Sequence, residues 1–186
     1  MNVVISGGLL MAGINLAFTK EWQFSLSKGN CVFISHKKED EEAAVEIGNY
    51  LMETVGVNIY LDVNDCILHE AVDSENDKKI VGSVIRGLEC CTHLLCITSD
   101  KTRLSWWVPY EIGYAEKKNL DITVLKLKDV EDIPSFLKIK KVINNINQFL
   151  HYVSSLNKYG DIFADRFYKS FSQKPYENLK KYIDED

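Results

Sequence analysis

The chain has 186 residues, of which 46% are hydrophobic and 26% are charged, and its formal net charge is −5. This length and composition are typical of one globular domain that holds a full hydrophobic core without disulfides. An acidic balance disfavours a protein whose main task is to coat nucleic acid or an anionic membrane, because phosphate binding needs clustered positive charge. We therefore expect no nucleic-acid partner and no membrane partner.

The N-terminal stretch 3–18 is uncharged and fairly apolar. It lacks the basic start of a signal peptide, since no Lys or Arg precedes Lys20. It is shorter than the roughly 20 apolar residues that span a bilayer. Polar and small residues also interrupt it, namely Ser6, Gly7, Gly8, Gly13 and Asn15. We expect this extension, residues 1–28, to pack on the domain or on a neighbouring subunit.

The cysteine pattern is that of a reduced, cytoplasmic protein. The five cysteines form an odd set and several lie in or beside apolar runs; they are Cys31, Cys66, Cys90, Cys91 and Cys96. The stretch 90–96, which also holds His93, invites a metal interpretation. Zinc sites usually add a second, distant cysteine pair, and this sequence has none. We expect core cysteines and no metal.

From residue 30 onward, short apolar runs alternate with helical spacing. The pattern predicts, in chain order, a strand at 31–35, a helix at 38–54, a strand at 57–61, a helix at 79–91, a strand at 93–98, a helix at 107–118, a strand at 122–127, a strand at 142–143 and a helix at 148–156. Strands that are separated by helices pair in parallel through crossover connections. The sequence therefore predicts an α/β fold, a doubly wound five-stranded parallel sheet with helices on both faces.

Three regions of the chain are expected. Apolar and aromatic residues recur at helical spacing beyond Gly160, which predicts a helical tail. The division is an N-terminal extension at 1–28, a domain at 29–157 and a C-terminal helical appendage at 158–186.

Ligands of open parallel sheets bind at the carboxyl ends of the strands, so these ends narrow the function. The first strand ends in Ser35 and His36, without the acidic pair that holds Mg²⁺ in a phosphoacceptor domain. The following turn has no glycine, which excludes a dinucleotide-binding fingerprint and a P-loop. No Gly-x-Ser-x-Gly elbow exists for a hydrolase nucleophile.

The remaining motifs form an ordered set. They are Phe33-Ile34-Ser35-His36, the helix that follows it, the strand ending at Asp62, Ile85-Arg86-Gly87-Leu88, the strand 94–99 and Trp107-Val108-Pro109-Tyr110-Glu111. In order and spacing, residues 30–157 resemble the Toll/interleukin-1 receptor (TIR) domain. The resemblance implies a flavodoxin-like sheet. It looks closest to the prokaryotic type that cleaves NAD⁺, as in the stand-alone TIR proteins of Thoeris-like antiphage defence, where the glutamate of Trp-x-x-x-Glu is catalytic.

The residues of that last motif also support a chemical role. Pro109 is tolerated only in the first turn of a helix, so the helix begins near Trp107, and Trp107 and Glu111 share one face. Loss of nicotinamide from NAD⁺ leaves an oxocarbenium-like ribose carbon, which a nearby carboxylate stabilises. Trp107 could stack the departing ring. The competing interpretation makes Glu111 a solvated helix residue and Trp107 a core anchor. One of the adjacent Trp106 and Trp107 is expected to face the core or a partner, and the spacing favours Trp107 for the site.

The resemblance also implies substrate contacts at the strand ends. Ser35 and His36 would contact ribose and phosphates, or instead cap the next helix. Lys37 would face the pyrophosphate, or lie in a solvated turn. Asp62 would bond a substrate hydroxyl, or cap its loop. The loop 63–78 departs from the family because it is acidic and lacks proline and glycine, and we expect it to be mobile or to contact a partner.

The function expected from the sequence is cleavage of NAD⁺, which is the substrate, with no separate cofactor. The products would be nicotinamide and either ADP-ribose or a cyclic ADP-ribose isomer, which a separate effector would sense. The resemblance implies a homo-oligomer formed through TIR–TIR contacts. The alternative is a non-catalytic TIR adaptor that acts by homotypic association, and a remoter one is a nucleoside-transferring enzyme.

Overall fold

The computed structural model describes residues 4–5, 8–9, 12–18, 29–61, 77–156 and 176–185. Its centre is a five-stranded sheet in the order β4-β3-β5-β6-β7, with every neighbouring pair parallel. The strands are β3 (Cys31–Ser35), β4 (Asn58–Tyr60), β5 (His93–Thr98), β6 (Asp121–Lys126) and β7 (Lys141–Ile143). The predicted doubly wound, flavodoxin-like sheet is therefore confirmed. The strand order reverses between β3 and β5, which is where such sheets bind ligands.

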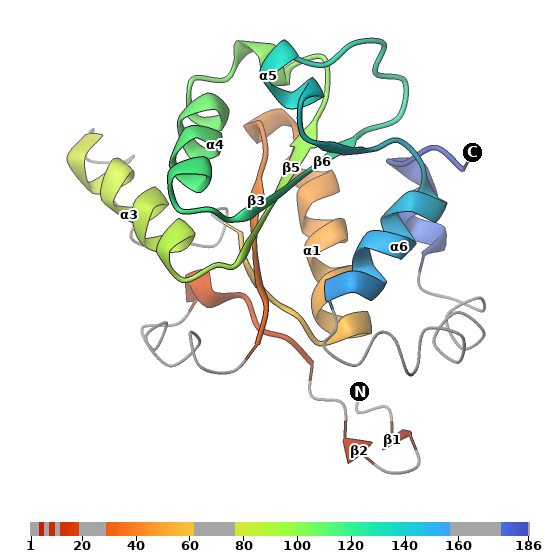
Figure 1. The fold of residues 1–186 in the computed structure, drawn as a ribbon. Coiled ribbons are helices and arrows are strands. Elements are labelled where there is room, and N and C mark those ends of the chain that lie inside the picture. Colours follow the sequence, from red (N-terminus) through yellow and green to blue (C-terminus); the bar gives the residue numbers. More distant parts are fainter. Residues whose placement is uncertain are drawn as a thin grey trace.

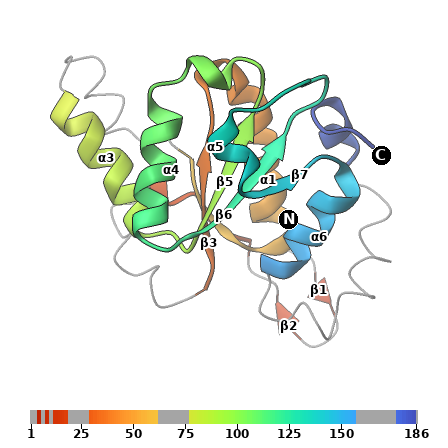
Figure 2. The same cartoon turned by 45° about the horizontal axis from the view of Figure 1, so that its top comes forward.

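Helices cover both faces of this sheet (Figure 1). One face carries α3 and α4, and the other carries α1 and α6, as the turned view also shows (Figure 2). The helices are α1 (Glu41–Val55), α3 (Asp77–Glu89), α4 (Trp107–Lys117), α5 (Ser135–Lys138) and α6 (Ile146–Leu156), with short 3₁₀ turns η3 (Lys38–Asp40) and η5 (Thr102–Leu104). The four helices predicted between residues 38 and 156 are present, and their bounds differ by a few residues.

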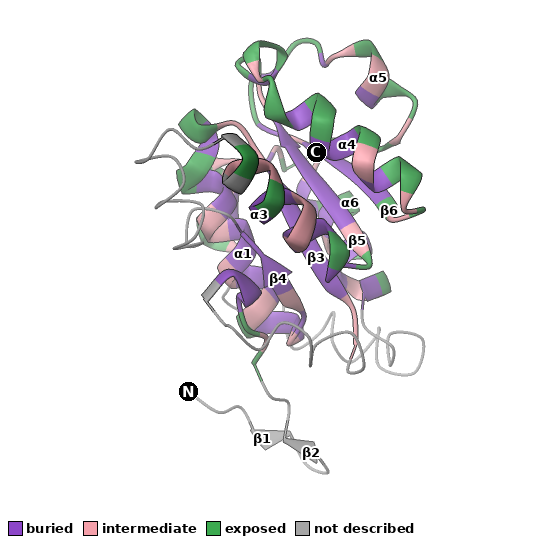
Figure 3. Cartoon of the chain, turned by 90° about the vertical axis from the view of Figure 1, so that its left-hand side faces the viewer, coloured by how far each residue is buried: buried purple, intermediate pink, exposed green. Residues whose placement is uncertain are grey.

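Apolar runs and a glycine in the sequence account for the strands and for the end of the first helix. All five residues of β3 are buried, as are the last five of β5, which explains their unbroken apolar runs (Figure 3). The first helix ends at Gly56, whose φ of 67° is left-handed and whose amide bonds the carbonyls of Leu51 and Met52. The chain can then turn directly into β4.

Residues 12–18 cover the outer edge of β4. The Ile59 amide donates to the Ile14 carbonyl at 3.0 Å, and the Leu61 amide donates to Asn15 Oδ1 at 3.2 Å. A Cβ at Gly13 would lie 2.0 Å from the Val57 carbonyl oxygen, so only glycine permits this approach. Leu16 and Ala17 join the core. This part of the N-terminal segment packs on the domain, and a small hairpin, β1 (Val4–Ile5) and β2 (Gly8–Leu9), precedes it.

The end of the chain docks beside α6 through η6 (Glu177–Lys181). The Lys128 amide donates to the Tyr182 carbonyl at 2.7 Å, and the Ile146 amide donates to the Asp184 carbonyl at 2.8 Å. Residues 158–175 of the predicted helical appendage lie outside the described residues, and its described part includes the 3₁₀ helix η6. Within the described ranges, no helix combines the length and apolarity that a membrane crossing requires.

Candidate active site

The predicted start of α4 is confirmed and explains where Glu111 lies. The helix begins at Trp107, which places Pro109 in its first turn, where a missing amide proton costs nothing. Glu111 follows in the second turn and faces the sheet, with only 5% of its surface exposed. Its Oε2 atom accepts a 2.5 Å hydrogen bond from Ser35 Oγ at the carboxyl end of β3. The structure thus joins two of the predicted site residues across the switch point of the sheet.

This bond argues against one alternative for each of the two residues. Glu111 is not a solvated helix residue, because it is buried. The Ser35 hydroxyl serves Glu111, whereas the N-cap of α1 is Asp40, which makes no side-chain cap bond. A buried carboxylate in a medium of low dielectric acts strongly on nearby charge. The pair can therefore present an oriented negative charge at the ligand-binding edge of the sheet.

Cys96 lies beside Ser35 on the neighbouring strand β5. It pairs with Ser35 in the sheet register and is fully buried. The pKa of its thiol is raised far above the usual range, first by burial and then by the negative charge of Glu111, while a hydrogen bond with Ser35 acts in the opposite direction. Full burial and the raised pKa both favour the neutral thiol over the reactive thiolate. Two residues further along, the buried Thr98 hydroxyl has no hydrogen-bond partner in the part of the chain that the structure describes.

The two tryptophans of the motif are both accessible. Trp107 is 40% exposed, and its ring meets Tyr110 edge-on with centroids 6.2 Å apart. Trp107 is therefore not a core anchor. Trp106 is 91% exposed, so it does not face the core of this chain. An aromatic surface lies on the same helix as Glu111, as the predicted stacking role requires.

The other predicted contacts lie in the turn after β3 or outside the described residues. His36 is half-buried and directly follows Ser35. Lys37 is also half-buried, and its Nζ lies 3.7 Å from a carboxylate oxygen of Glu39, so that part of its charge is already balanced. Asp62 and residues 63–76 of the acidic loop fall outside the described residues, and the last two residues of the predicted loop already belong to α3.

Sequence reasoning missed a second polar connection at this edge. Ser99 Oγ, just after β5, donates a 2.6 Å hydrogen bond to Oδ2 of the buried Asp40. Lys101 Nζ lies 4.0 Å from the other carboxylate oxygen. The signal available in the sequence was position alone, since both residues closely follow the two strands that flank the switch point.

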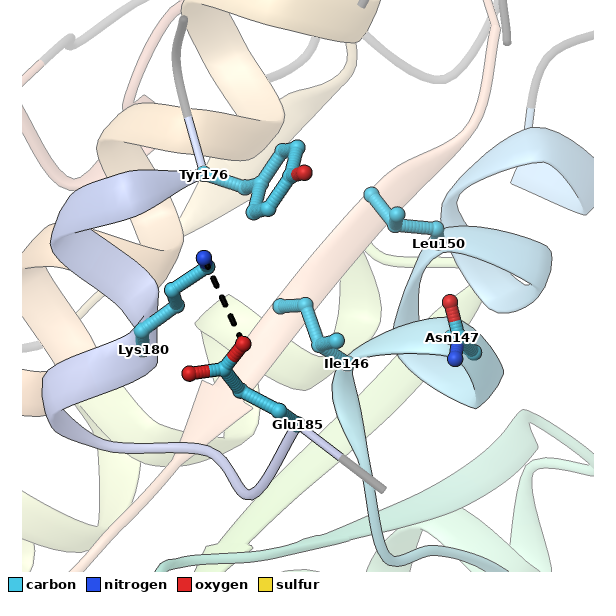
Figure 4. A pocket seen from close by; sticks show the side chains of 6 residues that line it. All are labelled: Ile146, Asn147, Leu150, Tyr176, Lys180 and Glu185. Carbon is cyan, nitrogen blue, oxygen red and sulfur yellow. Dashed lines mark ion pairs between the residues drawn. The ribbon is translucent and has the colours of Figure 1, made fainter. Parts of the chain in front are cut away.

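A separate small pocket lies on the far side of the molecule from α4. It has a volume of about 210 Å³ and lies between α6 and the C-terminal turn, where Lys180 reaches toward Glu185 and Tyr176 faces Leu150 (Figure 4). This volume is below the roughly 300–1,000 Å³ of most small-molecule sites. Among the described residues, no three histidine, cysteine or acidic side chains gather as a metal site would require.

Comparison with known families agrees with this geometry. The family model described as TIR domain matches residues 32–159, which is more than half of the 186-residue chain. The match spans every strand of the parallel sheet but for the first residue of β3, and it includes both Ser35 and Glu111. No curated protein matches the chain.

Proposed function

The chain belongs to the TIR domain family, and on that premise we propose that it cleaves the bond between nicotinamide and ribose in NAD⁺. The family includes both NAD-cleaving enzymes and adaptors, so membership alone leaves the activity open. The observation that supports catalysis is the buried Glu111 carboxylate, held by Ser35 at the carboxyl edge of the sheet. A glutamate that only faced solvent would be exposed, because acidic side chains are almost never fully buried unless they are paired.

The proposed reaction needs one well-placed carboxylate. The bond between ribose C1′ and the pyridinium nitrogen breaks, and its electron pair goes to that nitrogen, so nicotinamide leaves as a neutral molecule. Positive charge develops at C1′ and the ring oxygen, and Glu111 stabilises it. Ser35 holds the carboxylate in orientation through its 2.5 Å hydrogen bond. Trp107 offers a half-exposed indole face on which the leaving ring stacks.

The acceptor at C1′ determines the product. Water forms the new C–O bond and releases a proton, which gives ADP-ribose. A hydroxyl or ring nitrogen of the same molecule gives a cyclic ADP-ribose isomer instead. We propose that such a nucleotide acts as a signal in antiphage immunity, read by a separate effector in the cytoplasm, and that His36, Lys37 and Asp62 contact the substrate.

The test is incubation of the purified full chain with NAD⁺ at high protein concentration, with chromatography and mass analysis of every product. Glu111→Gln keeps the shape and hydrogen-bonding capacity but removes the charge, and we expect it to lower nicotinamide release by about 100-fold or more. Glu116→Gln is the matched control, because Glu116 lies on the same helix, is exposed and pairs with Lys140. No turnover by a chain shown to self-associate would refute the proposal.

The adaptor function has its own supporting observation. Leu104 and Trp106, two positions apart in the chain just before α4, are 72% and 91% exposed. Large exposed apolar side chains that gather in this way are typical of protein contact surfaces. TIR domains commonly self-associate, and we propose that this surface contributes to a homo-oligomer. An adaptor would lose association in Trp106→Ala, and it would show no NAD⁺ turnover before or after the change.

A further inference from the structure

Asp40 occupies an unusual position for an acidic residue. It lies at the junction of η3 and α1 and is buried, with 7% of its surface exposed. Burying a carboxylate is costly unless partners replace its water. Its partners come from a different part of the chain, since Ser99 Oγ donates to Oδ2 at 2.6 Å and Lys101 Nζ lies 4.0 Å from Oδ1. Asp40 therefore ties the turn after β3 to the loop after β5.

The connection continues from Ser99 to the start of α4. The Ser99 amide donates to Thr102 Oγ1 at 2.9 Å, and the Thr102 amide returns a bond to the Ser99 carbonyl at 3.0 Å. The Ser105 amide then donates to the Thr102 carbonyl at 2.9 Å, and Ser105 Oγ accepts from the Val108 amide at 3.2 Å. A continuous series of hydrogen bonds thus runs from Asp40 to the first turn of the helix that carries Trp107 and Glu111.

On its other side, Asp40 holds the turn that carries the remaining predicted contacts. Its amide donates to the Lys37 carbonyl at 2.8 Å. Lys37 follows Ser35 and His36 directly, so one residue is bonded to both loops that flank the candidate site. A hydrogen bond to a charged acceptor is about twice as strong as one between neutral groups. The charge of Asp40 accordingly suits it to fix the two loops relative to each other.

We propose that Asp40 is a positioning residue that, through Ser99, sets the placement of Glu111 and Trp107 against the turn after β3. The inference rests on the proposed NAD⁺ cleavage, because it assigns Asp40 a role in that reaction without contact with the substrate. Displacing a catalytic group by about 1 Å can cost about 100-fold in rate. The hydrogen-bonded series limits such displacement at the one helix that supplies both the carboxylate and the aromatic surface.

The experiment compares Asp40→Ala, Ser99→Ala and the double variant in the full chain. Hydrogen exchange of the backbone amides over residues 99–108 is measured beside NAD⁺ turnover. We expect exchange in this segment to become about tenfold faster, with α6 unchanged, and kcat to fall about tenfold with a smaller change in KM. Because both side chains act through one bond, the double variant should lose no more than either single variant.

Two further variants keep the test decisive. Asp40→Asn preserves the shape of the side chain and an acceptor for Ser99, so it reports on the charge even where Asp40→Ala fails to fold. Its kcat and its exchange rate at 99–108 should lie between those of the wild type and of Ser99→Ala. Ser155→Ala is the control, since Ser155 is an exposed serine whose hydroxyl donates to the Tyr152 carbonyl at 2.7 Å within α6. It should change neither kcat nor exchange at 99–108.

The outcomes separate this inference from the proposed function. Unchanged exchange at 99–108 overturns the positioning role, as does unchanged kcat in a variant whose loop has loosened. Additive losses in the double variant also overturn it, because they would mean independent actions. If the wild type turns over no NAD⁺, the proposed function fails, and the exchange measurement still decides whether Asp40 holds α4 in place.

Discussion

Two groups of buried polar side chains, the Ser35–Glu111 pair beneath α4 and the hydroxyls beneath α6, differ in whether they have a hydrogen-bond partner. On the α4 face, the Ser35 hydroxyl bonds the Glu111 carboxylate. On the α6 face, the Thr123 hydroxyl of β6 and the Tyr152 hydroxyl of α6 are both buried without a hydrogen-bond partner in the described part of the chain. An unpaired buried hydroxyl costs about 1–3 kcal/mol of stability. Burial of polar atoms alone therefore does not identify a site, and the proposed site rests on the pairing of the buried Glu111 carboxylate with Ser35 at the end of β3.

The largest expected effect comes from replacing the pair on the α4 face with apolar groups. In the double variant Ser35→Ala with Glu111→Met, we expect turnover to fall by about 100-fold or more. We expect the free energy of unfolding to stay the same or to rise by about 1 kcal/mol, because apolar replacement of buried charged groups is often neutral or stabilising. Product analysis and denaturant unfolding measure the two quantities. A fall of several kcal/mol in the free energy of unfolding would show that this pair supports the fold. The contrast with the unpaired hydroxyls beneath α6 would then disappear.

A smaller effect is expected beneath α6, where the change should alter stability and leave turnover unchanged. Tyr152→Phe removes a buried hydroxyl that is shielded from water and has no hydrogen-bond partner among the described residues. Burial also raises the pKa of this phenol far above its usual range. We expect the free energy of unfolding to rise by about 1 kcal/mol, which corresponds to a Tm about 2–4 °C higher. Turnover should not change. A less stable Tyr152→Phe protein would contradict the contrast, since it would reveal a partner for the hydroxyl.

The smallest effect concerns His93, at the start of β5 and far along the strand from Ser99. Burial lowers the pKa of its imidazole, and nearby Asp121 opposes the shift. The unfolded chain therefore binds a proton at His93 more readily than the folded chain does. Stability should fall as the pH decreases below about 6.5, and His93→Gln should flatten this dependence. Unfolding measured from pH 7 down to about pH 5 tests this, with His151→Gln on α6 as the control.

Much of the fold followed from local sequence patterns. The strand at 93–98 and the start of the helix at Trp107 were predicted to the residue, because an unbroken apolar run and a proline in a first turn are local signals. The helix that begins at Ile146 was predicted two residues late. A local signal was available there, since Asn145 Oδ1 caps the helix by accepting from the Gln148 amide at 2.9 Å, and the Ile146 amide also bonds the Asp184 carbonyl, 38 residues away.

The candidate site was only partly predictable, because its hydrogen bonds join residues that are far apart in the sequence. Glu111 and Trp107 stood out because they share one motif on one helix, and Ser35 because it ends a strand. The Ser35–Glu111 bond joins residues 76 positions apart, and the Asp40–Ser99 bond joins residues 59 apart. Both depend on which strands are neighbours. Local patterns indicated only that β3 and β5 exist. Their adjacency followed from the flavodoxin-like order that the resemblance implies, and the structure confirms it.

The cover over β4 has a consequence for how copies of this chain can meet. A bare edge strand offers its outward amides to any other strand, which invites sheet extension and aggregation. Here the outward amides of Ile59 and Leu61 are already bonded to the Ile14 carbonyl and the Asn15 side chain. The Asn15 amide also reaches the Leu61 carbonyl at 3.4 Å, so that one side chain imitates a paired strand residue. Growth of a continuous sheet through this edge is blocked, and contacts between copies at this end of the sheet must involve side-chain surfaces.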